Sequence, residues 1–292
     1  MKYEFIKQYK NEFPVVVMCQ ALEVSESGYY AWLKRPVCQH QREDAHIKQE
    51  IQQIFSTHQG RYGSPRVHRE LRDQGRSISR KRVARLMVEA ELAAKHKHRR
   101  VVTTKRDLTH PVALNVLHRE FTAKDPNKKW VTDITYIPTA QGWLYLAVIL
   151  DLYSRMVVGW SMSGNCDGGL VERALNQALA GRRPDPGLLH HSDRGSQYTS
   201  HAYQACLEKN GILVSMSRKG NCWDNAAMES FFGTLKEECL GNRIYGSHSE
   251  ARLAIFTSIE VYYNRIRRHS TLGYVSPFIY EQRMMKDEVR NS

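Results

Sequence analysis

Three apolar runs follow one another in the second half of the chain, and they restrict its fold more than any other feature. The runs are WVTDITYI (130–137), YLAVILDLYS (145–154) and MVVGWSMS (156–163). Each is rich in β-branched and aromatic residues, which is the composition typical of β-strands. We therefore expect three consecutive strands.

Helical and extended segments alternate beyond these runs. Further strands are expected for LLHHSD (188–193) and ILVSMS (212–217), and helices for about 168–180, 200–209, 219–236 and 249–267. Three strands followed by alternating helices and strands indicate an α/β domain with a mixed sheet flanked by helices. At 292 residues, the chain has room for this domain and a second one.

The chain is strongly basic, and the excess charge is unevenly distributed. The formal net charge is +13 and the sequence pI is about 9.5. Residues 61–106 contain fifteen Lys or Arg side chains against four acidic ones. A polyanionic partner is therefore expected, with nucleic acid the first candidate, and its contact surface should lie mainly in the N-terminal part.

The basic region has the pattern of a helix-turn-helix. Ser64 and Pro65 predict the start of one helix, Gly75 breaks the pattern, and Ser77 or Ser79 can cap a second helix. Two short helices joined by a glycine turn, the second basic at its start, are typical of DNA-binding proteins. The alternative is a helical hairpin with a solvated basic face. The candidate DNA contacts are Arg66, Arg80, Lys81, Arg82 and Arg85.

Composition changes between the two halves of the chain. The stretch AAKHKHRRVVTTKRDLTHP has no clear period and ends in proline, so we expect a linker. The predicted division is an all-helical, helix-turn-helix-like region at 1–100, a basic linker at 101–122 and the α/β domain at 123–285. The apolar run YLAVIL stops at Asp151, far short of a membrane span, and the N-terminus has no secretory signal. A cytoplasmic protein is expected.

Three carboxylates stand out by their positions in the α/β domain. Asp133 lies inside the first strand, Asp193 ends a later strand, and Glu229 follows Asp193 after 35 intervening residues. Converging carboxylates supply the hard oxygen ligands that a pair of Mg²⁺ ions needs. Asp151, at the end of the second strand, is a weaker candidate for the same site. His190 and His191 are expected to face opposite sides of their strand and are left out of the chemistry.

The stretch KGNCWDNAAMESFFGTLK (219–236) contains Glu229. If this stretch is one helix, Glu229 shares a face with Asn225, one turn before it, and with Lys236, two turns after it. Taken alone, Glu229 is either a solvated surface charge or a group held over a cleft. Asn225 is either a ligand-orienting or DNA-contacting residue or a packing residue of that helix face.

Five blocks of sequence resemble the DDE transposases of bacterial insertion sequences, in particular the second-frame product (OrfB) of the "IS three" family. The blocks are WVTDITYI, LDLYSRMVVGW, HSDRGSQYTS, KGNCWDNAAMESFFGTLKEE and YNRIRRHSTLGYVSPFIYE. The resemblance implies a ribonuclease-H-like catalytic core, also found in retroviral integrases. It further implies that Asp133, Asp193 and Glu229 form a metal-binding catalytic triad for two Mg²⁺ ions, with Mn²⁺ as a substitute. Lys236 resembles a basic residue that contacts substrate DNA near its terminus.

The same resemblance implies partners and a location. Element ends and target DNA are the expected substrates, the working form is expected to be a homo-oligomer on DNA, and the place is the bacterial cytoplasm, in association with the nucleoid. Family members commonly work as a fusion with a first-frame (OrfA) segment. This chain shows no sustained heptads, so we expect it to lack that multimerisation element. The zinc module of retroviral integrases is also missing.

Two other functions are compatible with parts of the sequence. A DNA-binding regulator that is inert without its fusion partner would explain the basic region, but the intact triad favours catalysis. A glycosidase would use two carboxylates across a sugar cleft. The basic excess and the helix-turn-helix pattern argue against that second alternative.

Overall fold

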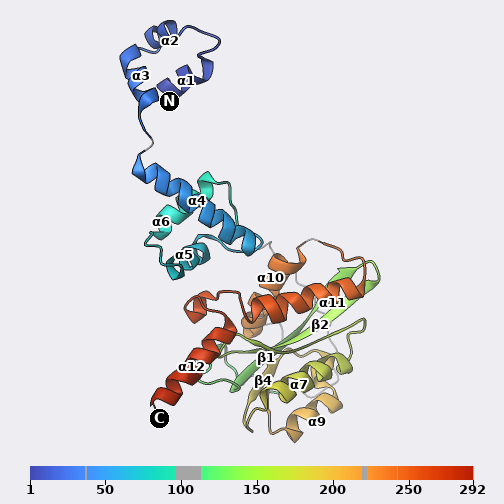
Figure 1. The fold of residues 1–292 in the computed structure, drawn as a ribbon. Helices are drawn as coiled ribbons and strands as arrows, with labels where there is room; N and C mark the ends of the chain where they lie inside the picture. The colour runs from blue at the N-terminus through green and yellow to red at the C-terminus, as the bar shows by residue number, and fades with distance from the viewer. Residues whose placement is uncertain (37, 96–112, 219–221, 242, 292) are drawn as a thin grey trace. The chain divides into compact units, whose positions relative to one another are not determined.

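The computed structural model describes residues 1–36, 38–95, 113–218, 222–241 and 243–291. It divides into two compact units, Met1–Ala93 and Ala94–Ser292 (Figure 1). The first unit is helical, and the second contains a five-stranded sheet flanked by helices. This confirms the predicted fold class. No helix in the described part of the chain combines the length and the apolar character that a membrane span requires.

Two groups of three helices make up the first unit. The first group is α1 (Lys2–Tyr9), α2 (Val15–Ala21) and α3 (Glu26–Lys34), and the second is α4 (Gln39–Thr57), α5 (Ser64–Asp73) and α6 (Arg80–Glu89). Ile6, Met18 and Tyr29 are buried together in the first group. The side chain of Ser25 caps α3 by accepting a hydrogen bond from the N–H of Gly28. Tyr3, Tyr9 and Trp32 are partly buried against this small core, whereas Phe5, Phe13 and Tyr30 are exposed.

The predicted pair of basic helices corresponds to α5 and α6. Ser79 caps α6, because its hydroxyl accepts a hydrogen bond from the N–H of Arg82. Gly75 has φ +86°, a left-handed conformation that glycine adopts without strain, and it makes the turn between the helices. The N-cap of α5 is Gly63 and not Ser64, so Pro65 lies in the first turn.

The sheet of the second unit is mixed, as predicted. Its strands are β1 (Lys129–Thr139), β2 (Gly142–Asp151), β3 (Val157–Ser163), β4 (Leu189–Ser192) and β5 (Leu213–Met216). Their order is β3-β2-β1-β4-β5, in which β1, β2 and β3 are antiparallel neighbours and β4 runs parallel to both β1 and β5.

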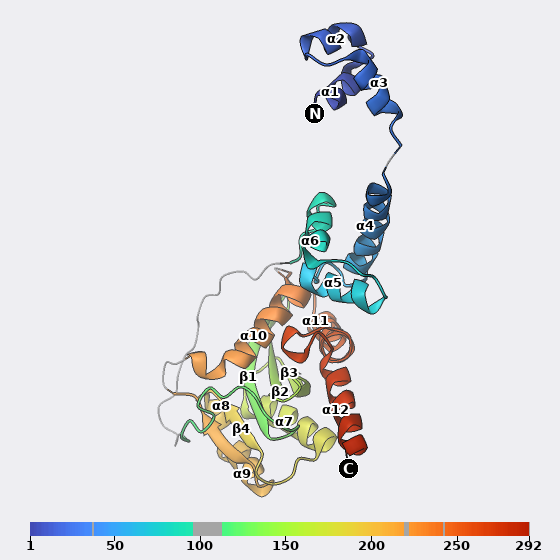
Figure 2. The ribbon, with the colours of Figure 1, turned by 90° about the vertical axis from the view of Figure 1, so that its left-hand side faces the viewer.

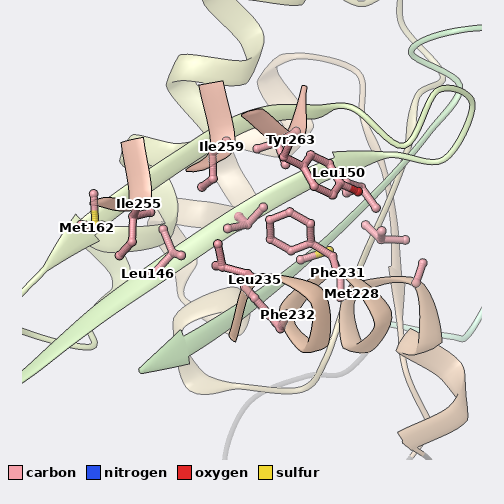
Figure 3. Close-up of a cluster of buried hydrophobic side chains, with 14 of the residues drawn as sticks. Leu146, Leu150, Met162, Met228, Phe231, Phe232, Leu235, Ile255, Ile259 and Tyr263 are labelled. Atoms are coloured by element: carbon pink, nitrogen blue, oxygen red, sulfur yellow. The ribbon is translucent and has the colours of Figure 1, made fainter. Parts of the chain in front are cut away.

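Helices cover both faces of this sheet, as Figures 1 and 2 show. One face packs against α7 (Gly168–Arg182) and α9 (His201–Lys209), and the short helix α8 (Ser196–Thr199) precedes α9. The other face packs against α10 (Ala226–Leu235) and α11 (His248–Phe256). Figure 3 shows this second core, in which Phe231, Phe232 and Leu235 of α10 meet Leu146 and Ile255. The strands alternate between the two cores because successive side chains point to opposite faces.

The last third of the chain differs from the sequence-based expectation in its helix boundaries. Within the predicted helix 219–236, residues 219–221 lie outside the described residues, Cys222–Asn225 form a 3-10 turn (η1), and α10 begins at Ala226. The predicted helix 249–267 is α11 followed by a π-helical segment, η3. The segment η3 spans Thr257–Tyr263. The elements of this part that were not predicted are η2 (Lys236–Leu240), η4 (Ser270–Leu272) and α12 (Pro277–Asn291).

Residues just before β1 pack against the rest of the second unit. Leu117 is buried in the core beneath α10, and the hydroxyl of Ser215 on β5 accepts hydrogen bonds from the N–H groups of Val116 and Leu117. Residues 101–112 of the predicted linker lie outside the described residues.

Gly159 on β3 lies where α7 crosses the sheet, and it allows the backbones of the two elements to approach closely. A Cβ atom at this position would lie 2.3 Å from the carbonyl oxygen of Ala174 and 2.8 Å from the Cβ of Ala178. We expect Gly159→Ala to destabilise the protein by about 1–3 kcal/mol, because the helix must move away from the strand. Thermal unfolding measures this effect. Gly181→Ala, where nothing lies within 4 Å, should leave stability unchanged or slightly raised.

Candidate active site

Strand β4 is short, and its end exposes the edge of the central strand. It pairs with β1 only from Lys129 to Val131, in a parallel register that places Val131 opposite His191. Asp133 is two residues beyond Val131 in β1, and Asp193 directly follows β4, two residues beyond His191, so the register directs both aspartates to the same end and face of the sheet. The register of the sheet brings the first two predicted site residues together.

The pKa of Asp133 is affected by the nearby charge of Asp193. Burial is the main effect that raises the pKa of Asp133, and the negative charge of Asp193 raises it further. The N–H of Ile134 donates to the Asp133 carboxylate over 2.8 Å and lowers its pKa. Of the two charged side chains nearby, Glu229 raises this pKa and Lys236 lowers it. Burial also raises the pKa of Asp193, against a 2.9 Å hydrogen bond from the N–H of Gly195.

Helix α10 holds Glu229 on the same side of the sheet. Met228, Phe231 and Phe232 are buried in the core, while Glu229 is half-buried, as the helical spacing requires. Glu229 is close enough to contribute to the electrostatics of Asp133. The structure therefore gathers all three predicted carboxylates around the open edge of β1.

Asn225 joins α10 to β1. Its side chain is buried, and its Nδ2 donates to the carbonyl oxygen of Thr132 over 3.2 Å. That carbonyl belongs to the residue next to Asp133, and Asn225 is one turn before Glu229. The bond satisfies a backbone acceptor at the edge that β4 leaves open, as a packing residue of this helix face would. The ligand-orienting and DNA-contacting alternatives for Asn225 stay predictions.

Asp224, beside Asn225, is the centre of a polar network that the sequence analysis did not identify. Its carboxylate is fully buried and accepts hydrogen bonds from Asn115 (2.8 Å), Arg119 (3.0 Å) and both the backbone and the guanidinium of Arg218 (2.9–3.0 Å). The Arg218 guanidinium, then the backbone N–H of Arg218 and the Arg119 guanidinium, hold the pKa of Asp224 well below its usual range, against the opposing effect of burial. This network fixes η1, from which α10 starts.

Lys236 lies at the C-terminal end of α10, near the carboxylates. Its ammonium is 5.2 Å from the ring centre of Tyr136 on β1, and its charge lowers the pKa of Asp133. The predicted neighbourhood of Lys236 and the triad is therefore present in the structure.

Asp151 and the two histidines belong to the framework. Asp151 is fully buried, accepts hydrogen bonds from the N–H groups of Asn127 (2.8 Å) and Tyr153 (2.9 Å), and pairs with Arg182. Burial lowers the pKa of His190 to about 3 and that of His191 to about 4, so both rings are neutral at pH 7. His190 contacts the hydroxyl of Tyr203, while His191 contacts Ser215 and Ser217 on the opposite side.

Comparison with known proteins decides the family. Models described as "Integrase core domain" match residues 123–222 and 210–277, and one described as "HTH-like domain" matches 41–100. The chain is 41% identical to the transposase InsF for insertion sequence IS3A of Escherichia coli, over 97% of this chain and 99% of that protein. The chain belongs to the insertion-sequence transposases of the IS3 family. It is therefore an enzyme of DNA transposition, a polynucleotidyl transferase of the DDE type.

The chain is similar to two further proteins. An uncharacterized 31 kDa protein of insertion element IS600 from Shigella sonnei is 43% identical over 91% of this chain and 98% of its own length. The HTLV-2 integrase catalytic core domain in complex with magnesium is 17% identical, over 53% of this chain and 96% of that chain, with a TM-score of 0.40.

The candidate metal ligands, Asp133, Asp193 and Glu229, are all carboxylates. Among the described residues, no three or more His, Cys, Asp or Glu side chains are arranged so that they could already hold a metal ion. The negative charge of Asp193 nevertheless raises the pKa of Asp133, and Glu229 raises it to a smaller extent. Hard oxygen atoms with unfavourable mutual repulsion fit a divalent cation such as Mg²⁺, because its charge removes the repulsion.

The basic residues of the transposase's α5 and α6 have different surroundings. Arg82 and Arg85 each donate to the buried Asp44 of α4 over 2.7 Å. Their hydrogen bonds to Asp44 lower the pKa of this acid, that from Arg85 most. Arg80 and Lys81 are exposed at the start of α6, and the guanidinium of Arg66 lies 5.4 Å from the ring centre of Tyr62. Asp44 could not be recognised from the sequence as the partner of residues about 40 positions away.

Proposed function

We propose that Asp133, Asp193 and Glu229 hold two Mg²⁺ ions, or Mn²⁺ in their place, and that the transposase uses them to cut DNA at the ends of its insertion sequence and to join those ends to a target. The observation that supports this proposal is the parallel register of β1 and β4, which pairs Val131 with His191, two residues before Asp133 and Asp193, together with the effect of Glu229 and Lys236 on the Asp133 carboxylate. When bound, the ions activate a water molecule or a DNA 3′-hydroxyl and stabilise the leaving 3′ oxygen in an in-line displacement at phosphorus.

The protein's own groups set the geometry of this reaction. The sheet fixes the two aspartates, and the hydrogen bond from Asn225 to Thr132 holds the helix of Glu229 against the same strand. Lys236 supplies a positive charge beside the carboxylates, where a DNA phosphate has to approach them. No residue of the chain is needed as a covalent nucleophile.

The metal sites can be tested without a turnover assay. We expect Mg²⁺ or Mn²⁺ to raise the melting temperature of the wild-type protein, because a ligand that binds only the folded state stabilises it. Asp193→Asn should lose most of this increase, and Asp185→Asn, an exposed acid on a loop, should keep it. An equal increase in the wild-type and Asp193→Asn proteins would place the ions elsewhere.

The HTH-like domain is proposed to bind the element ends through Arg66, Arg80, Lys81, Arg82 and Arg85. Phosphate binding releases counterions, so affinity falls with salt, and the removal of one phosphate-binding side chain reduces the salt slope by about one. Replacing Arg80 and Lys81 together with Ala should therefore lower the salt slope by about two. Lys209→Ala, on α9 of the catalytic unit, should leave it unchanged. Fluorescence anisotropy over a range of salt concentrations measures the slope, and an unchanged slope in the double variant would exclude both residues as phosphate ligands.

We also propose that the transposase acts as a homo-oligomer on DNA and that a first-frame (OrfA) protein is its partner. The deciding experiment incubates labelled element-end duplex and a target plasmid with Mg²⁺ and the transposase, with and without the first-frame protein. Nicked ends and joined products from the transposase alone show that it is self-sufficient. Products only in the presence of the first-frame protein show that this partner is required. Specific binding without products under both conditions would contradict the proposed function and favour a regulatory role.

A further inference from the structure

We propose that an aromatic platform on the β1–β2 hairpin, formed by Tyr136 and Trp143 and flanked by Lys236, stacks on an unpaired nucleobase of the DNA end at the catalytic carboxylates. The inference rests on the proposed function, since it places substrate DNA at that site. It adds a base-contacting surface to a site whose other groups act on phosphates.

The two rings lie on one face of the hairpin. In the register of β1 and β2, Tyr136 is opposite Tyr145 and Trp143 is opposite Pro138, so Tyr136 and Trp143 are diagonal neighbours. Their ring centres are 5.1 Å apart, with an interplanar angle of 83°. Tyr136 is 40% exposed and Trp143 is 51% exposed. The platform is therefore ordered by ring–ring contact while much of its surface remains open to a ligand.

Lys236 connects this platform to the catalytic carboxylates. Its ammonium is 5.2 Å from the ring centre of Tyr136, and it follows Glu229 by seven residues, about two helical turns. Along β1, Tyr136 is three residues beyond Asp133, a separation of about 10 Å, and strand alternation directs the two side chains to opposite faces, so Lys236 is the group that links the platform to the site. At about 3.4 Å per nucleotide along a strand, this distance corresponds to about three nucleotides. A base on the platform would thus belong to the DNA next to the reacting phosphate.

The chemistry of the platform favours a nucleobase in DNA. Aromatic rings combined with positive charge are how proteins bind single-stranded nucleic acid, because every base has a face that can stack. A base inside a duplex is already stacked on both faces, so the platform fits a base that is unpaired at the end. Another exposed aromatic residue of this unit, Phe256, has different surroundings: it packs on Trp160, whose Nε1 donates to the carboxylate of Glu260. An acidic neighbour of that kind opposes contact with DNA.

The test is a double-mutant cycle of DNA-binding affinity, in which one change is a protein substitution and the other is the removal of a single base from the DNA. Element-end duplexes carry a single abasic nucleotide, moved position by position across the cleaved bond, and affinity is measured by anisotropy in a non-cutting Glu229→Gln background. Trp143→Ala should weaken binding of unmodified DNA about ten-fold. On DNA that is abasic at the stacked position, the same substitution should cost less than about two-fold, because the base it contacts is already absent. Trp143→Phe should retain most of the affinity, and Phe256→Ala should change nothing. Circular dichroism and melting temperature confirm that each variant is folded.

Three results would overturn the platform. An unchanged affinity in Trp143→Ala shows that the surface does not touch DNA. A loss of the same size on every abasic duplex shows contact with the DNA backbone and not with a base. Altered self-association of Trp143→Ala without DNA, measured by sedimentation, shows an interface between copies of the chain. The proposed function would fail by a different result. If the wild-type protein gave no cleavage products while Trp143→Ala and abasic DNA still showed the expected affinities, base stacking would stand and the catalytic role would be rejected.

Discussion

Glu229→Gln lowers DNA cleavage and strand transfer by about a thousand-fold or more, while the protein remains folded and binds element-end DNA. Charge stabilisation by bound metal ions is worth several kcal/mol, and each 1.36 kcal/mol corresponds to a factor of ten in rate. The substitution keeps the size of the side chain and removes one carboxylate from the group around Asp133. Single-turnover cleavage of a labelled end measures the loss.

The matched control for this loss is Glu208→Gln. Glu208 is an exposed acid on α9, and its replacement removes the same charge from the other side of the sheet. Its cleavage rate should equal that of the wild-type protein. If Glu229→Gln cleaves as fast as this control, Glu229 is a solvated surface charge, which is the alternative that the sequence left open.

Asp224→Asn lowers both the stability and the cleavage rate of the transposase. The substitution removes the charge to which Arg119 and Arg218 donate, and hydrogen bonds to charged groups are worth about 1.5–3 kcal/mol. We therefore expect the free energy of unfolding to fall by about 2–4 kcal/mol. Cleavage falls as well, because η1 fixes the start of the helix that bears Glu229. Denaturant unfolding and cleavage assays measure the two effects.

The pH dependence identifies Asp224 as the source of this stability. Because its pKa in the folded protein is depressed by Arg218, the contribution is fully present above the ordinary pKa of about 4 and is lost as the pH falls towards the folded value. The difference in stability between the wild-type and Asp224→Asn proteins should thus be constant near neutral pH and shrink below about pH 4. A difference that stays constant throughout acid titration would exclude a charge effect. Asp185→Asn, on an exposed loop, is the control.

The sequence was sufficient for features that depend on neighbouring residues. Strands β1, β2 and β3 were predicted because β-branched and aromatic residues dominate each run, and Ser79 was recognised as a possible cap because N-capping is local. Asp133 and Asp193 could be paired as candidates since one lies within a strand and the other ends one.

Features that depend on distant residues could not be predicted. The start of α10 at Ala226 follows from bonds between Asp224 and Arg119, which are 105 positions apart. The hydrogen bonds of Arg82 and Arg85 to Asp44 join α6 to another helix, α4. In each case, the sequence contains the charges but not the pairing, which only tertiary structure brings about.

The packing of residues 113–121 determines where the chain can be divided. A fragment that begins at residue 123 would contain the whole sheet, yet it would leave the space filled by Leu117 empty and remove the hydrogen bonds from Val116 and Leu117 to Ser215. It would also remove Asn115 and Arg119, so that Asp224 would keep Arg218 alone. An independently folding catalytic fragment should therefore begin no later than Ala113. Residues 113–121 are as much a part of the enzyme's architecture as α10, the helix that they support.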